Sequence, residues 1–102
     1  MSAAFPLTPD ELRSGRVVRV MSLGREEFFR MLPGAVELPI VHRGDGAQGR
    51  GWMLQVSVQP SLNIALLSLP RLRVQIDFPS PDPVRMQTFM ARFDRHFQRG
   101  GG

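Results

Sequence analysis

Arginine is the residue type in this sequence whose chemistry stands out. All 13 residues counted as Lys or Arg are arginine, against 9 Asp and Glu, and the formal net charge at pH 7 is +4. A guanidinium group binds a phosphate or a carboxylate through two parallel hydrogen bonds, so an arginine-rich surface suits an anionic partner. The codon bias of a GC-rich bacterial genome would produce the same composition without any such partner, and it is the simpler explanation.

Two groups of arginines could form binding surfaces. They are Arg71 and Arg73 in a predicted strand, and Arg85, Arg92, Arg95 and Arg99 in the predicted C-terminal helix. The helix group would suit a nucleic-acid backbone or another polyanion, although an ordinary solvated helix face accounts for the same spacing. The strand group would suit contact with another protein, because the predicted outer face of the sheet displays no aromatic ring on which RNA bases could stack.

Other residue types offer little chemistry. The sequence has no cysteine, and its two histidines, His42 and His96, form no HxH or HxxxH pair. No nucleophile with a base, and no pair of carboxylates, has a recognisable spacing. We therefore expect no cofactor, no metal and no catalytic residue, while an enzyme whose site is assembled from distant residues stays open as an alternative.

Residues 44–49 formally match GxGxxG, the glycine pattern of phosphate-binding loops. In a dinucleotide-binding fold this pattern follows a strand and opens a helix, whereas the residues after this segment alternate as a strand. We interpret the segment as the flexible tip of a hairpin.

The sequence carries no signal for export or for membrane insertion. Residues 1–7 lack the basic and apolar regions of a secretory signal. The longest apolar stretch, residues 62–69, is interrupted by Asn63 and Ser68 and is far shorter than the roughly 20 residues of a membrane helix. These features predict a cytoplasmic protein that does not associate with membranes.

Two helices and a strand are predicted in the first third of the chain. A capping sequence that begins at Thr8 predicts a short helix, which Gly15 ends. The valine-rich residues 16–21 predict a strand. The apolar spacing over residues 22–32 predicts a second helix, which Pro33 and the following glycine stop.

Four extended segments are predicted after these helices, over residues 36–42, 51–59, 63–69 and 71–78. Strict alternation of apolar and polar residues in the second and fourth segments indicates strands with one buried face, and such strands pair antiparallel. The side chains predicted to point inward are those of Trp52, Leu54, Val56 and Val58, and of Leu72, Val74, Ile76 and Phe78. Pro70 cannot donate to a ladder, so it marks a corner between two strands or a bulge on an edge.

The C-terminal helix has the clearest pattern. Asp82 is placed to cap it, Pro83 suits its first position, and it is predicted to run to about Gln98. One stripe of this helix is apolar, opposite the arginines, and consists of Met86, Phe89, Met90, Phe93 and Phe97.

Together these elements predict a single α+β domain over residues 1–102, with an antiparallel sheet of about four strands and two helices packed on one face. Residues 1–7 are predicted to be a flexible arm, and residues 100–102 a flexible tail.

The third extended segment is predicted to be apolar on both sides, with Ile64 and Leu66 opposite Leu67 and Leu69. A strand with one buried face does not need a second apolar face, so a protein partner, a second copy of the chain or residues 1–7 could cover it. The leading hypothesis is a small protein-interaction or accessory subunit, with a protein partner or as a homodimer. A nonspecific nucleic-acid or polyanion binder is the second hypothesis, and an enzyme is the third.

Overall fold

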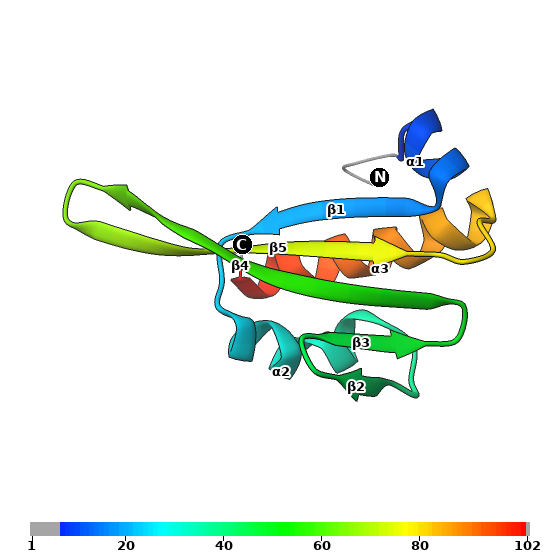
Figure 1. Ribbon diagram of the computed structural model, residues 1–102, viewed down its shortest axis with the longest axis horizontal. Helices are drawn as coiled ribbons and strands as arrows, with labels where there is room; N and C mark the ends of the chain where they lie inside the picture. The colour runs from blue at the N-terminus through cyan, green and yellow to red at the C-terminus, as the bar shows by residue number, and fades with distance from the viewer. Residues whose placement is uncertain (1–6, 102) are drawn as a thin grey trace.

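Five antiparallel strands form one sheet, in the order β1-β5-β4-β3-β2, and three helices accompany it (Figure 1). The computed structural model describes residues 7–101, with side chains over residues 7–98. In chain order the elements are α1 (Pro9–Ser14), β1 (Arg16–Met21), α2 (Arg25–Ala35), β2 (Val41–Arg43), β3 (Gly46–Gly49), β4 (Trp52–Ile64), β5 (Leu67–Asp77) and α3 (Pro83–Gly101). The predicted α+β class with an antiparallel sheet is confirmed, with five strands where about four were expected.

The glycine-rich segment is a hairpin tip only at its start, and the rest of it is a strand. Gly44, with a φ of 54°, forms the turn that folds β2 onto β3, and residues 46–49 are the strand β3 itself. A Cβ on Gly46 would lie 2.5 Å from the carbonyl oxygen of Leu54, so only glycine lets β3 lie this close to β4. Of the predicted strand over residues 36–42, only its end belongs to β2.

The three extended segments predicted between residues 51 and 78 are two long strands. β4 continues through Pro60, β5 continues through Pro70, and the chain reverses at Ala65 and Leu66. The prediction of a corner at Pro70 is therefore wrong, and its alternative, a bulge, is confirmed: Pro60 and Ser61 interrupt the register opposite Pro70. Proline is tolerated here because each strand has one free side at this point, where no neighbour needs an N–H.

The side chains predicted to point inward do so over the body of the sheet. They form one core with α2 and α3: the ring of Trp52 lies 5.3 Å from that of Phe89 in α3, and α2 contacts α3 through the rings of Phe28 and Phe97 at 5.0 Å. Val58 is the exception, because 69% of its surface is exposed. Its prediction as a core residue is wrong, since no described helix residue covers that part of β4.

The helix ends follow local capping and tertiary packing. The capping box of α1 is confirmed, and Oδ1 of Asp82 accepts a hydrogen bond from the amide of Val84 at 3.0 Å at the start of α3. The predicted stop of α2 at Pro33 is wrong: the helix continues to Ala35, which is buried in the core. α3 continues to Gly101, beyond the predicted end at Gln98, and includes Gly100 and Gly101 of the predicted tail.

Gly34, near the end of α2, lies against a side chain of α3. A Cβ at this position would lie 2.6 Å from Cε1 of His96, so a larger residue here would require the His96 ring to move. Of the predicted N-terminal arm, Leu7 is buried, and the rest, residues 1–6, lies outside the described residues.

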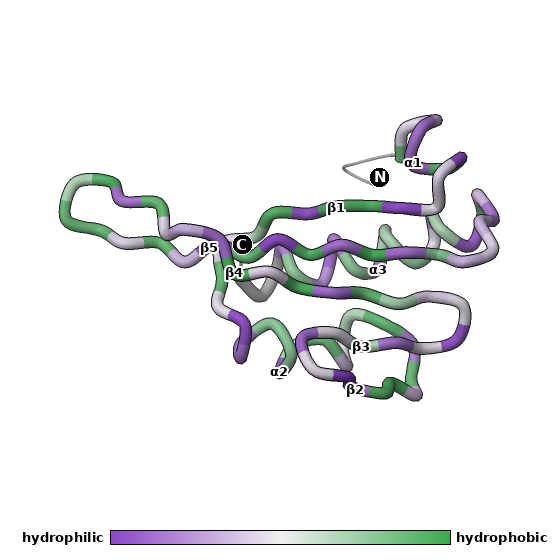
Figure 2. Tube along the Cα trace, viewed as in Figure 1, coloured by the Kyte–Doolittle hydropathy of each residue, from purple (hydrophilic) through white to green (hydrophobic). Residues whose placement is uncertain are grey.

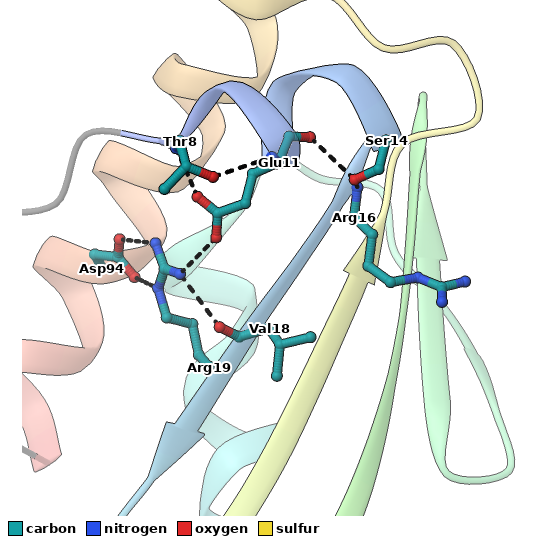
Figure 3. Close-up of polar contacts among 7 residues, drawn as sticks. All are labelled: Thr8, Glu11, Ser14, Arg16, Val18, Arg19 and Asp94. Carbon is teal, nitrogen blue, oxygen red and sulfur yellow. Dashed lines mark hydrogen bonds and ion pairs between the residues drawn. The ribbon is translucent and has the colours of Figure 1, made fainter.

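A half-buried ion pair joins the edge strand β1 to α3 (Figure 3). Nε and Nη2 of Arg19 each donate to one carboxylate oxygen of Asp94 at 3.0 Å, and Nη1 lies 3.8 Å from Oε2 of Glu11 in α1. The Arg19 and Asp94 side chains are only 21% and 15% exposed. Because Glu11 also takes part in the capping box, one arginine connects α1, β1 and α3.

Over residues 7–101, no helix combines the length and hydrophobicity that crossing a membrane requires.

Candidate functional site

The most unusual surface is the projecting hairpin, defined as residues 58–71. Pairing with β1 ends at Leu72, and pairing with β3 ends at Gln55, so the hairpin continues alone beyond the sheet. Figure 1 shows it extending away from the helices, with its two strands crossing in this view where they leave the sheet. The crossing reflects a strong local twist, which bulges produce in antiparallel ribbons.

One face of the projecting hairpin is apolar. Leu62 is the cross-strand partner of Leu69, and Ile64 is the partner of Leu67, so all four side chains share a face. The other face carries the pair of Asn63 and Ser68. The prediction of a single strand with two apolar sides is therefore wrong: the turn at Ala65 and Leu66 places Leu67 beside Ile64 rather than opposite it.

The apolar face is open to solvent in the described structure. Exposed fractions are 45% for Leu62, 52% for Ile64 and 63% for Leu67, and Leu66 at the turn is 100% exposed. No charged residue occurs from Val58 to Pro70, and Figure 2 shows the hydrophobic residues grouped at the end of the hairpin. Contiguous apolar patches of this kind mark sites of association in soluble proteins.

Arg71 and Arg73 lie at the base of the projecting hairpin. By the alternation of β5 they point to the same side of the strand as Leu67 and Leu69. Arg73 donates to Oε1 of Gln75 at 3.3 Å, and Gln75 donates to Asp77 at 3.1 Å, which forms a polar chain along the sheet face opposite the helices. The structure thus places the predicted strand arginines next to the apolar face.

The predicted helix arginines separate into two groups. Arg85 and Arg92 line a cleft of about 430 Å³ together with Arg50, and we call this the arginine cleft. Arg95 is exposed and does not line the cleft, and the side chain of Arg99 lies outside the described residues. Arg50 was not singled out from the sequence, because it is 35 residues before Arg85 and only the fold brings them together.

The two histidines lie at separate places. His42 is exposed on β2 with its ring 5.5 Å from that of Phe29, and His96 lies on α3 against Phe97. Neither lines the arginine cleft. Within residues 7–101, no group of three or more His, Asp or Glu side chains is placed to hold a metal ion.

A comparison with protein-family models finds no match for this chain, and a comparison with curated proteins finds none either. The features from which a function can be inferred are therefore the two surfaces described above, the projecting hairpin and the arginine cleft.

Proposed function

We propose that this chain is a small protein-association subunit that pairs with a second copy of itself through the apolar face of the projecting hairpin. The observation that carries the proposal is the cross-strand ladder of Leu62, Leu69, Ile64 and Leu67 on one exposed face. Burying apolar surface stabilises association by about 25 cal/mol per Å² before the entropy cost of association is subtracted.

A second copy suits this face better than a charged partner. The hairpin from Val58 to Pro70 offers no charge to an acidic or basic surface. A two-fold contact, in contrast, brings the same apolar ladder against itself without any charge repulsion. The charges that give the chain its net +4 all lie outside this segment, and the nearest of them along β5 are Arg71 and Arg73 at its base.

Arg71 and Arg73 would form the polar rim of such a contact. Interfaces commonly surround an apolar centre with polar residues, and arginine is enriched there because its aliphatic stem packs while its guanidinium stays solvated. The hairpin is narrow compared with a standard interface of about 1,600 Å². We therefore expect pairing in the micromolar range, with a Kd of roughly 1–100 μM.

Sedimentation equilibrium over a wide concentration range tests the proposal. The wild-type chain is expected to shift from monomer to dimer as the concentration rises. Leu67→Asp should weaken the dimer by at least about 10-fold, because it places a charge in the apolar contact. Ser68→Asp is the matched control: it adds the same charge at the neighbouring residue on the opposite face, and it should leave the dimer intact.

Three results would overturn the proposal. A chain that stays monomeric up to about 500 μM, well above the expected Kd, has no such pairing. Equal dissociation by Leu67→Asp and Ser68→Asp would show that the apolar face is not the contact. Binding of the monomer to phosphatidylcholine vesicles in a flotation assay, lost in Leu67→Asp, would assign the hairpin to a lipid surface instead.

A further inference from the structure

The arginine cleft lies at the other end of the body from the projecting hairpin, where four segments meet. They are the end of α2, the turn between β3 and β4, the loop between β5 and α3, and the first half of α3. Its volume of about 430 Å³ falls in the range of small-molecule sites, which is about 300–1,000 Å³. The cleft is therefore large enough for a small organic ligand.

The floor of the cleft is aromatic. Trp52, Phe78 and Phe89 all line it, and the ring of Phe89 lies 5.3 Å from that of Trp52 and 5.2 Å from that of Phe78. Trp52 and Phe78 are buried, whereas Phe89 is half-buried. Such rings give a rigid apolar surface against which a flat or aliphatic group can pack.

The rim of the cleft is cationic. Arg50, Arg85 and Arg92 come from different parts of the chain, and Glu37 is the carboxylate that lines the cleft with them. Three arginines against one glutamate leave a formal excess of +2 in the lining.

These three arginines have no carboxylate partner among the described side chains, which is also true of other arginines on the surface, such as Arg71 and Arg95. Arg13, Arg16, Arg19 and Arg25 each lie within 4.0 Å of an Asp or Glu oxygen. Over the side chains that the structure describes, no such pair involves an arginine of the cleft. Charges of one sign beside a low-dielectric floor raise the local concentration of the opposite charge, so the rim attracts anions.

Gly51 leaves room for one of the rim arginines. It has a φ of 82°, and a Cβ placed on it would lie 2.9 Å from Nη2 of Arg85. The guanidinium of Arg85 therefore lies close to the turn between β3 and β4, which also carries Arg50. The Arg85 side chain lines the cleft and is exposed, so its guanidinium is accessible to a ligand.

From this arrangement we infer that the arginine cleft binds a small amphipathic anion. An aromatic or aliphatic body packs against Phe89 and its neighbouring rings, and one carboxylate or phosphate group pairs with the guanidinium groups of the rim. This site is separate from the proposed pairing surface and does not depend on it.

Trp52 makes the inference directly measurable. It is the single tryptophan, the chain has no tyrosine, and the indole is part of the cleft floor. Its fluorescence therefore reports on a ligand in the cleft with little background from other residues. Two probes that differ by one sulfonate test the role of charge: 8-anilino-1-naphthalenesulfonate is the anion, and N-phenyl-1-naphthylamine is its neutral counterpart.

The anionic probe should bind with saturation, change the Trp52 emission, and bind at least about 10-fold more tightly than the neutral probe. Raising KCl from about 50 to about 500 mM should lower the affinity of the anionic probe several-fold and leave the affinity of the neutral probe unchanged. Arg50→Gln, Arg85→Gln and Arg92→Gln should each weaken the anion by about 3- to 10-fold at unchanged affinity for the neutral probe.

Arg95→Gln is the matched control, because it removes an exposed arginine of the same helix outside the cleft. It should leave both probes unaffected, as should Leu67→Asp on the projecting hairpin. A chain that failed to dimerise would therefore leave the inference about the cleft intact. A chain that failed to bind the probe would leave the proposed dimerisation intact. Circular dichroism on each variant confirms that the fold is intact.

Displacement of the anionic probe identifies the head group. Competition by 1-naphthoate and by 1-naphthyl phosphate, with neutral 1-naphthalenemethanol as reference, separates a carboxylate from a phosphate ligand. Tighter binding of either anion than of the alcohol supports the inference and assigns its chemistry.

Several outcomes would overturn the inference. They are equal affinity for the charged and neutral probes, no saturable signal up to about 1 mM probe, and a loss in Arg95→Gln as large as that in Arg92→Gln. Displacement by an oligonucleotide but by none of the small anions would point instead to a polyanion on the surface of α3.

Discussion

The two halves of the β4–β5 hairpin have the same strand pairing and opposite surroundings. In the body, the apolar residues of β5, such as Leu72 and Val74, are fully buried. In the projecting hairpin, Leu67 and Ile64 are more than half exposed. Cross-strand pairing is continuous through both halves apart from the bulge, so the difference does not arise from the strands themselves.

The bulge explains how the apolar face changes sides. Along β5 the apolar residues from Leu72 to Phe78 are even-numbered, whereas Leu67 and Leu69 are odd-numbered. Successive residues of a strand point to opposite faces, so the apolar side chains change from one face of β5 to the other at Pro70. On β4, one extra residue at the bulge turns Leu62 and Ile64 to the same side as their β5 partners. The chain thus directs one apolar face to its own helices and a second one to solvent.

The largest expected effect is in the body. Phe93 is fully buried and its ring lies 4.7 Å from that of Phe97 and 6.3 Å from that of Phe89. Phe93→Ala should lower the free energy of unfolding by about 3–5 kcal/mol, measured by urea denaturation, because it leaves a large cavity. Val58→Ala, at an exposed position of β4, is the comparison and should cost less than about 0.5 kcal/mol. A comparable loss in both variants would show that Val58 is also packed.

A medium effect is expected at the ion pair of β1 and α3. Arg19→Met keeps the length of the side chain and removes two charge-assisted hydrogen bonds to Asp94, so it should lower the free energy of unfolding by about 1–3 kcal/mol. Arg13→Met removes an ion pair with Asp10 that is exposed on both sides, and it should change the stability by less than about 0.5 kcal/mol. Thermal unfolding of the two variants in parallel measures the difference, and equal losses would contradict the role of burial.

The smallest effect on stability is expected in the projecting hairpin. Replacing Ile64 and Leu67 together by serine removes side chains that are more than half exposed in the monomer and contact mainly each other, so the free energy of unfolding of the monomer should fall by less than about 1 kcal/mol. The measurement requires a protein concentration below the Kd of the proposed dimer. A loss above about 1 kcal/mol would mean that the hairpin packs on its own body, which would remove the contrast between the two halves.

Local patterns predicted much of the fold. The capping residues at Thr8 and Asp82, the valine-rich strand β1 and the apolar stripe of α3 are all confirmed, because each depends on contacts within a few residues or on side-chain direction alone. The prolines were predicted only in part. Pro33 was expected to stop α2 but lies within its last turn, whereas the bulge expected as one alternative at Pro70 is present. Pro60 and Pro70 lie where their strands have a free side, so their missing N–H groups cost little there.

The candidate sites were predicted only in part. Arg71, Arg73, Arg85 and Arg92 were chosen by residue type and spacing, and each borders one of the two surfaces. Arg50, Glu37 and Phe78 were not associated with the helix arginines, because the cleft joins segments that are far apart along the chain. No periodicity within one segment contains that information.

Over the body of the sheet and the helices, the sequence by itself determined the direction of the side chains: which residues alternate, which share a helix stripe, and where a helix can begin. Only the tertiary structure decided which of those faces are covered and which arginines converge. The physical reason is that direction depends on local backbone geometry, whereas covering a face depends on where another element packs. For β4 and β5, α2 and α3 pack against the inner face of the body, and the projecting hairpin lies beyond their reach.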